Sequence, residues 1–124
     1  MKVAMQSLKL RSNVFKRVYK ITGEIPIGKV MTYGEIGKIL GITPRVVGWA
    51  LHANKDKNVP CHRVVNKEGK LADNFSGPQA PDAQAIGRRA FDGWKEQRRR
   101  LIVERVGFVD ERHVDLKRFR YSFI

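Results

Sequence analysis

Two helix signals follow one another closely between residues 32 and 51, and this pair restricts the fold of the chain more than any other feature. Thr32 and Glu35 have the spacing of a capping box, in which a hydroxyl and a carboxylate satisfy the free backbone donors at a helix start. The helix behind them is predicted to end at Gly41 and to bury three apolar residues, Ile36, Ile39 and Leu40.

A second helix is predicted directly after this turn. Thr43 can cap it, and Pro44 then stands at the first helical position, where its missing N–H costs nothing. Its apolar face would consist of Val46, Val47, Ala50 and Leu51. On pattern alone, a DNA-binding helix-turn-helix and an ordinary αα-hairpin fit equally well.

Charge favours the DNA-binding alternative. Lys and Arg number 25 against 12 Asp and Glu, and the resulting net charge of +13 attracts nucleic acid. On composition alone, a merely basic protein that binds RNA non-specifically is the other interpretation. No apolar run is long enough to span a bilayer and residues 1–10 do not resemble a signal peptide, so a cytoplasmic protein is expected.

The whole pattern predicts one mainly α-helical domain over residues 1–124, with a winged helix-turn-helix-like core and a few short strands. We expect this domain to be a monomer. Residues 1–11 are expected to be a strand or a loose lead-in to a helix that starts at Ser12 or Asn13 and ends at Gly23.

The second half of the chain is less regular. Residues 54–60 predict a polar loop, residues 61–65 a helical turn or a strand, and residues 71–93 a long surface loop. A further helix is expected from about Phe91 to Gly107. Its inner stripe would hold Trp94, Leu101 and Arg105, and residues 97–100 would form the opposite, solvated face.

The single cysteine, Cys61, is the residue with the most informative chemistry. One cysteine excludes an internal disulfide and a multi-cysteine zinc site. A thiol is nucleophilic only as the thiolate, and its ordinary pKa of about 8.5 keeps it protonated at neutral pH. His62 could take the proton, directly or through a water, and Glu104 could orient the imidazole. In isolation, however, a lone cysteine is more often a small buried apolar residue.

The run Pro-Cys-His-Arg-Val-Val at residues 60–65 resembles the active-site signature of the O6-alkylguanine-DNA alkyltransferases, also called methylated-DNA–protein-cysteine methyltransferases. Further motifs of that family occur before and after this run, in the family's order, at residues 25–36, residues 45–48, Asn54 and residues 101–104. The resemblance covers about residues 12–109, and several motifs in the same order are more specific than any one of them.

This resemblance implies direct, irreversible repair of duplex DNA that contains O6-alkylguanine, without a cofactor or a metal. Members of the family bind the minor groove and flip the damaged guanine into a pocket, where Cys61 would take the alkyl group. Arg45 would fill the space that the base leaves, and Tyr33 would press on its phosphate. Thr43 and Gly48 would also lie at the DNA.

The resemblance also assigns the residues around the thiol. His62 and Glu104 would form a proton relay with Cys61, and Asn54 would brace the turn between the second helix and the cysteine. The guanine pocket would be lined by Pro60, the backbone of Val64, Phe75 and Ser76.

The chain departs from the family in several places. The N-terminal domain of larger members is not expected here. Residues 74–78 replace a Tyr-Ser-Gly-Gly-like run, residues 78–92 are longer than expected, and Arg105 follows Glu104 where the family has glycine. These features and residues 97–100 also resemble the alkyltransferase-like proteins. Those proteins bind alkylated guanine without a reactive cysteine, usually with tryptophan in its place, and signal to excision repair.

The cysteine decides between these alternatives at the level of sequence. Because Cys61 and its adjacent base His62 are both present, the sequence favours the enzyme over a lesion sensor that recruits excision-repair proteins. A minor-groove binding module without lesion preference is the third interpretation.

Overall fold

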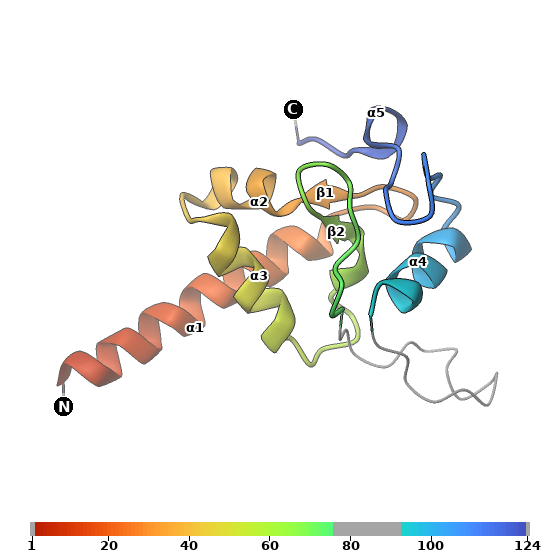
Figure 1. Cartoon of the computed structure of the whole chain (residues 1–124). Coiled ribbons are helices and arrows are strands. Elements are labelled where there is room, and N and C mark those ends of the chain that lie inside the picture. The colour runs from red at the N-terminus through yellow and green to blue at the C-terminus, as the bar shows by residue number, and fades with distance from the viewer. Residues whose placement is uncertain (1, 76–92, 124) are drawn as a thin grey trace.

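The computed structural model describes residues 2–75 and 93–123, with side chains from residue 13 onward (Figure 1). Its elements in order are α1 (Lys2–Gly23), β1 (Met31–Thr32), α2 (Tyr33–Leu40), α3 (Pro44–Ala53), the 3-10 helix η1 (Cys61–Arg63), β2 (Val64–Val65), α4 (Trp94–Val103) and α5 (Leu116–Phe119). The mainly helical fold with a helix-turn-helix in α2 and α3 is as predicted. None of the described helices is long and apolar enough to cross a membrane.

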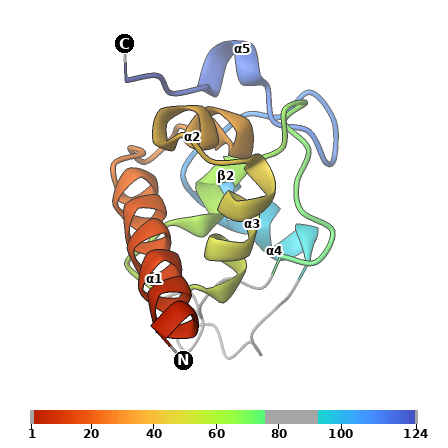
Figure 2. The same ribbon diagram turned by 90° about the vertical axis from the view of Figure 1, so that its left-hand side faces the viewer.

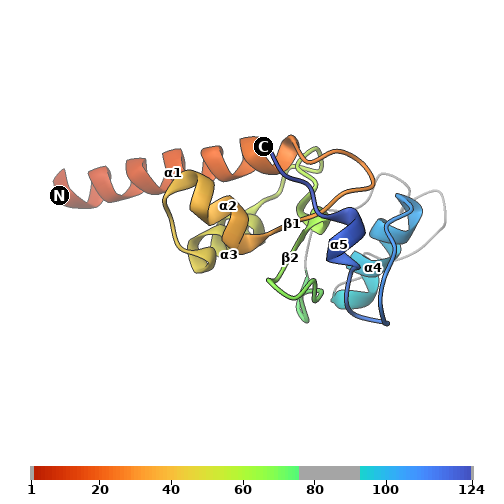
Figure 3. The same cartoon turned by 90° about the horizontal axis from the view of Figure 1, so that it is seen from above.

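The two short strands separate two hydrophobic clusters. Helices α1 to α3 lie on one side of the strand pair, and α4 and α5 lie on the other (Figures 1 and 3). β1 and β2 run parallel, with Met31 opposite Val64. Because side chains alternate along a strand, Met31 and Val64 join the cluster of the first three helices, whereas Val65 joins the cluster that contains Leu101 of α4.

Helix α1 begins earlier than the sequence predicts. It starts at Lys2, so Ser12 and Asn13 lie within the helix and do not cap it, whereas its end at Gly23 is as predicted. Residues 2–11 contain Lys, Ala, Met, Gln and Leu and neither Gly nor Pro, and this composition favours helix over the expected strand or loose lead-in. Figure 2 shows α1 alongside α2 and α3. The Tyr19 hydroxyl donates to the Ala50 carbonyl of α3 at 2.7 Å.

Threonine hydroxyls cap both helices of the helix-turn-helix, as the sequence predicts. The Thr32 hydroxyl oxygen accepts a hydrogen bond from the Glu35 N–H at 3.1 Å, and the Thr43 hydroxyl oxygen accepts one from the Val46 N–H at 3.3 Å. Among the described residues, the Glu35 carboxylate accepts from the Thr32 hydroxyl at 3.0 Å and not from a backbone N–H, so it does not complete the predicted capping box. Gly41 ends α2 in the left-handed region, with φ of 71°.

One apolar residue of α2 is not where the pattern puts it. Ile36 is fully buried, whereas Ile39 is 48% exposed. The reason lies at Gly37, where an added Cβ would lie 2.5 Å from the Ile42 carbonyl oxygen, so the turn into α3 packs directly against the α2 backbone. The buried face of α2 is therefore centred on Ile36 and Gly37.

Helix α4 ends at Val103, whereas the sequence pattern extends to Gly107. A Schellman motif closes its end, in which the Val106 N–H donates to the Leu101 carbonyl at 3.0 Å. Arg105 occupies the left-handed position of this motif, with φ of 67°. The chain has therefore left the helix before Arg105, which does not share a stripe with Leu101.

The start and the inner face of α4 also differ from the prediction. The helix begins at Trp94, and residues 91 and 92 lie outside the described part of the chain. Gln97, expected on the solvated face, is fully buried, and Glu96 is only 4% exposed. Polar residues therefore share this face with the buried Leu101, so its hydrophobic periodicity is weak.

Residues 61–65 were predicted to be either a helical turn or a strand. They form a helical turn followed by a strand, so both predicted structures occur in this segment. The surface loop expected from residue 71 is wrong at its start, because Leu71 and Phe75 are buried. Residues 76–92 of that loop lie outside the described residues.

Candidate active site

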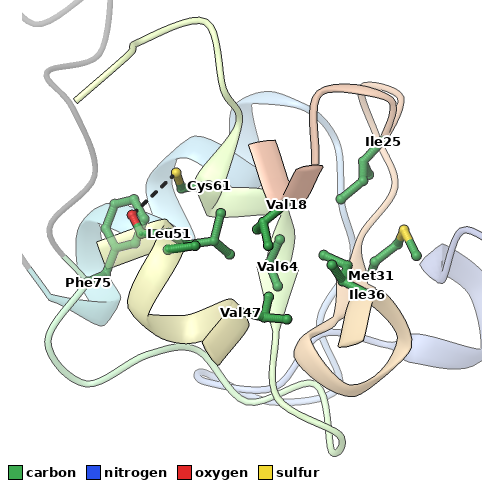
Figure 4. Packing of buried hydrophobic residues seen from close by; sticks show 10 residues of the cluster. Val18, Ile25, Met31, Ile36, Val47, Leu51, Cys61, Val64 and Phe75 are labelled. Atoms are coloured by element: carbon green, nitrogen blue, oxygen red, sulfur yellow. Dashed lines mark hydrogen bonds between the residues drawn. The ribbon is translucent and has the colours of Figure 1, made fainter. Parts of the chain in front are cut away.

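Cys61 lies where the chain returns to the end of α3. The helix ends at Ala53, a polar loop follows, and Pro60 leads into η1. The Cys61 side chain is 7% exposed and packs into the cluster of the first three helices (Figure 4). The thiol donates to the Leu51 carbonyl at 3.8 Å.

The Asn54 side-chain amide fixes both the loop and the sulfur. Its Nδ2 donates to the Cys61 Sγ at 3.1 Å and to the Asp56 carbonyl at 3.0 Å. Its Oδ1 accepts from the Asp56 N–H at 3.1 Å. This geometry is compatible with the bracing role expected for Asn54 and adds a direct contact with the sulfur.

Burial controls the protonation of this thiol. Burial raises the pKa of Cys61, and the hydrogen bond from Asn54 and the charge of Arg100 lower it by less. The pKa therefore stays above its ordinary value. The thiol is protonated at neutral pH and needs a base in order to react.

A cavity of about 420 Å³ opens beside Cys61. Helices α2 and α3, η1 and the segment after β2 line it, with Tyr33, Gly48, Trp49, Leu51, His52, Ala53, Cys61, Ala72, Asn74 and Phe75. Pockets for small ligands have volumes of about 300–1,000 Å³, so this cavity is large enough for a nucleobase. Burial raises the pKa of the Tyr33 phenol, which therefore remains a neutral hydrogen-bond donor at the cavity wall.

His62 and Glu104, predicted as a pair, are in contact. The His62 Nε2 lies 2.8 Å from the Glu104 Oε2. Arg63, to which the sequence analysis gave no role, donates to the same carboxylate through Nε at 2.9 Å and through Nη2 at 2.8 Å. Its Nη1 donates to the Ile25 carbonyl at 2.8 Å.

These contacts keep the Glu104 carboxylate ionised and oriented. Burial raises the pKa of Glu104, but the hydrogen bonds and charges of His62 and Arg63 outweigh burial and lower the pKa from 4.5 to about 2. Among the described residues, the thiol bonds Asn54 and Leu51 and not His62. If the Nε2 hydrogen of His62 points to Glu104, Nδ1 is the ring atom that can accept a proton.

Gln97 is a residue of this site that the sequence analysis missed. Its Nε2 donates to the His62 carbonyl at 3.2 Å and to the Val64 carbonyl at 2.9 Å. Its Oε1 accepts from the Ala72 N–H at 2.9 Å. One buried amide therefore joins the cysteine segment to the cavity wall, and a glutamine beside three arginines gives no sequence signal for this role.

The arginines of α4 are part of the fold and do not form the solvated face that was predicted. The Glu96 carboxylate accepts from the Arg99 Nε at 3.0 Å and from the Arg100 Nε at 2.7 Å. The Arg100 guanidinium lies 5.2 Å from the Phe75 ring centroid. The Arg98 guanidinium lies 5.1 Å from the ring centroid of Phe108. The Arg100 contact joins α4 to the cavity wall at Phe75.

The residues expected at DNA lie on or near α3. Tyr33 and Gly48 line the cavity, and Arg45 is exposed in the first turn of α3. Thr43 caps that helix. Two of these four residues therefore line the cavity, and the other two lie at the start of α3.

Only one of the four residues expected to line the guanine pocket lines the cavity in the described part of the chain. Phe75 lines the cavity, whereas Pro60 and Val64 are buried outside its lining. The Val64 side chain packs in the core and its carbonyl accepts from Gln97. Ser76 lies outside the described residues.

Comparison with known proteins shows the family to which the chain belongs. The family model described as the DNA-binding domain of 6-O-methylguanine DNA methyltransferase matches residues 13–106. A methylated-DNA–protein-cysteine methyltransferase of Saccharolobus islandicus is 44% identical over 68 residues, which cover 54% of this chain and 42% of that relative. The match thus spans less than half the length of that methyltransferase.

Two further proteins match over most of the chain. A DNA base-flipping protein of Escherichia coli is 31% identical over 112 residues, covering 87% of this chain and 74% of the relative. The crystal structure of S. pombe Atl1 in complex with damaged DNA containing O6-carboxymethylguanine matches with a TM-score of 0.65 and 29% identity. This match covers 90% of the chain and 96% of the Atl1 chain.

Proposed function

Because this chain belongs to the family defined by the DNA-binding domain of 6-O-methylguanine DNA methyltransferase, we propose that it repairs O6-alkylguanine in duplex DNA by moving the alkyl group to Cys61. One observation carries the proposal: the Cys61 sulfur borders a cavity of nucleobase size and accepts a hydrogen bond from Asn54. A buried sulfur cannot reach a stacked guanine, so the damaged base has to leave the double helix and enter the cavity.

In the proposed reaction, the Cys61 sulfur attacks the alkyl carbon, and the bond between that carbon and the guanine O6 breaks. The thiol loses one proton and the released guanine gains one at N1, so the products are a thioether and neutral guanine. The Asn54 amide stabilises negative charge on the sulfur. The His62 Nδ1 takes the thiol proton through one water, while Glu104 holds the other ring nitrogen at 2.8 Å.

The DNA-facing residues support base flipping in this proposal. Helix α3 enters the minor groove, Arg45 occupies the space of the extruded base and Tyr33 contacts its phosphate, with Thr43 and Gly48 close to the backbone. If Arg45 acts in this way, Arg45→Ala slows methyl transfer from duplex DNA by at least about tenfold and leaves transfer from the free base unchanged. Equal losses on both substrates would contradict the insertion of Arg45 into the stack.

A non-catalytic lesion sensor is the second candidate, and two observations favour it. The thiol pKa is raised, and among the described residues the thiol has no direct bond to His62. A protein of this kind would bind O6-alkylguanine in the same cavity and present it to excision-repair proteins.

The deciding experiment is the intact mass of the protein after incubation with a duplex that contains O6-methylguanine, followed by peptide mapping. We expect one methyl group in place of one hydrogen, on Cys61, and no mass change in Cys61→Ser. An unchanged mass together with tighter binding to the damaged duplex would reject transfer and support the sensor.

A further inference from the structure

Helix α3 has two faces of different chemistry. Val47, Ala50 and Leu51 are buried against the core. The exposed face carries Arg45 and Trp49, which are separated by one helical turn and therefore point in the same direction. A positive charge and a large aromatic ring thus lie side by side on the helix expected to contact DNA.

Trp49 is both solvent-exposed and part of the cavity lining. Its side chain is 57% exposed, and it also lines the cavity that contains the Cys61 sulfur. It therefore lies at the cavity mouth. None of the ring contacts recorded between described residues involves Trp49. A partner that covered the indole would gain about 25 cal/mol of hydrophobic free energy for each Å² of apolar surface removed from water.

We propose that Trp49 is a specificity-determining residue whose indole stacks on the extruded nucleotide at the mouth of the cavity. The proposal rests on the proposed function, because it requires a base that leaves the duplex. A nucleobase fits because each base has a flat π-face that stacks on aromatic side chains without regard to sequence.

The surroundings of Trp49 favour a nucleotide over a protein partner. Arg45 on the same face is suited to the phosphate backbone. Trp49 and Cys61 line the same cavity, so an occupant that reaches Cys61 also lies close to the indole. Stacking at this point stabilises the extruded state and leaves the stacked duplex unaffected.

Intrinsic fluorescence tests this contact directly. The chain has two tryptophans, so Trp94→Phe leaves Trp49 as the single reporter. In the Cys61→Ser, Trp94→Phe protein, methyl transfer cannot alter the titration. We expect strong quenching by a duplex with O6-methylguanine and weaker quenching by the matched undamaged duplex at the same salt concentration. Equal quenching by the two duplexes would overturn the proposal.

Affinity gives the second test. We expect Trp49→Ala to weaken binding of the damaged duplex by about tenfold, the scale of one base–aromatic stack, and to change binding of the undamaged duplex by less than about twofold. Trp49→Phe should keep most of the affinity. Val103→Ala removes another exposed apolar side chain, 67% exposed on α4, and should change neither affinity.

The outcomes separate this inference from the proposed function. If the wild-type protein takes a methyl group but Trp49→Ala binds the damaged duplex as tightly as wild type, the stacking role is wrong and transfer stands. If the wild-type protein takes no methyl group but Trp49→Ala loses affinity selectively, the stacking role stands and transfer is rejected.

Discussion

In α2 and α3, the hydrogen bonds that set the helix starts join residues three apart, whereas those that hold Cys61–Val64 to Gln97 and Glu104 join residues 33 to 42 apart. The first kind depends on neighbours in the chain, and each cap can be lost without affecting the other. The second kind forms one polar network, in which the loss of a single residue leaves several buried groups without partners. The two regions should therefore respond differently to substitution.

The largest effect is expected at the centre of the polar network. Gln97→Leu leaves two carbonyls and one N–H without their partner, and unsatisfied buried groups cost about 1–3 kcal/mol each. We expect the free energy of unfolding, measured with urea, to fall by about 3 kcal/mol or more. Val103→Ala on the exposed face of the same helix should stay within about 0.5 kcal/mol of wild type. A stable Gln97→Leu protein would show that water replaces the amide.

Glu104→Gln should have the next largest effect and a distinct pH signature. It removes the charge that compensates Arg63, and we expect a loss of about 2 kcal/mol at neutral pH. The folded-state pKa of Glu104 is lowered from 4.5 to about 2, so its stabilisation is complete above pH 4.5 and is lost as the pH falls toward 2. In Glu104→Gln, stability should therefore fall less steeply over this range. An acid unfolding curve as steep as that of wild type would contradict the ion pair.

A cap of the helix-turn-helix should cost less. Thr43→Ala removes the side-chain acceptor for the Val46 N–H, and we expect a loss of about 1 kcal/mol in urea unfolding. Thr43→Ser should retain nearly all of the stability, because the hydroxyl remains. A loss as large as that of Gln97→Leu would mean that the two regions are coupled more tightly than their hydrogen bonds indicate.

The smallest effect should have the opposite sign. Arg105 is the only described residue other than glycine with a positive φ, of 67°. Arg105→Gly removes the steric cost of this conformation and should raise the free energy of unfolding by about 0.5–1 kcal/mol. The measurement is the shift in the urea midpoint. A decrease would indicate that the long side chain makes a stabilising contact that outweighs the strain.

The same difference explains what the sequence could predict. The starts of α2 and α3 and the end of α2 were predicted correctly, because Thr32, Gly41 and Thr43 act on their own neighbours. Ile39 was placed wrongly because the orientation of α2 depends on how closely the following turn approaches Gly37.

The site was predicted in part for a related reason. The contact between His62 and Glu104 was expected because both residues belong to recognisable motifs. Gln97 was assigned to the solvent because it lies in a charged run, and its buried position follows only from backbone groups far along the chain. Arg105 departs from the expected glycine, yet it keeps the conformation that a glycine would adopt most easily.

The β1–β2 pair has a mechanical consequence for the proposed reaction. Thr32 pairs with Val65 in the sheet and also caps α2, so the strand after the cysteine is tied through one residue to the start of the helix-turn-helix. Together with the Asn54 bond to the sulfur, this frame sets the separation between the thiol and α3. In the proposed reaction, the DNA and not the protein therefore has to deform to bring the damaged base to the thiol. The ease with which the damaged base leaves the double helix would then depend on the flexibility of the neighbouring base steps, which is greatest at pyrimidine–purine steps.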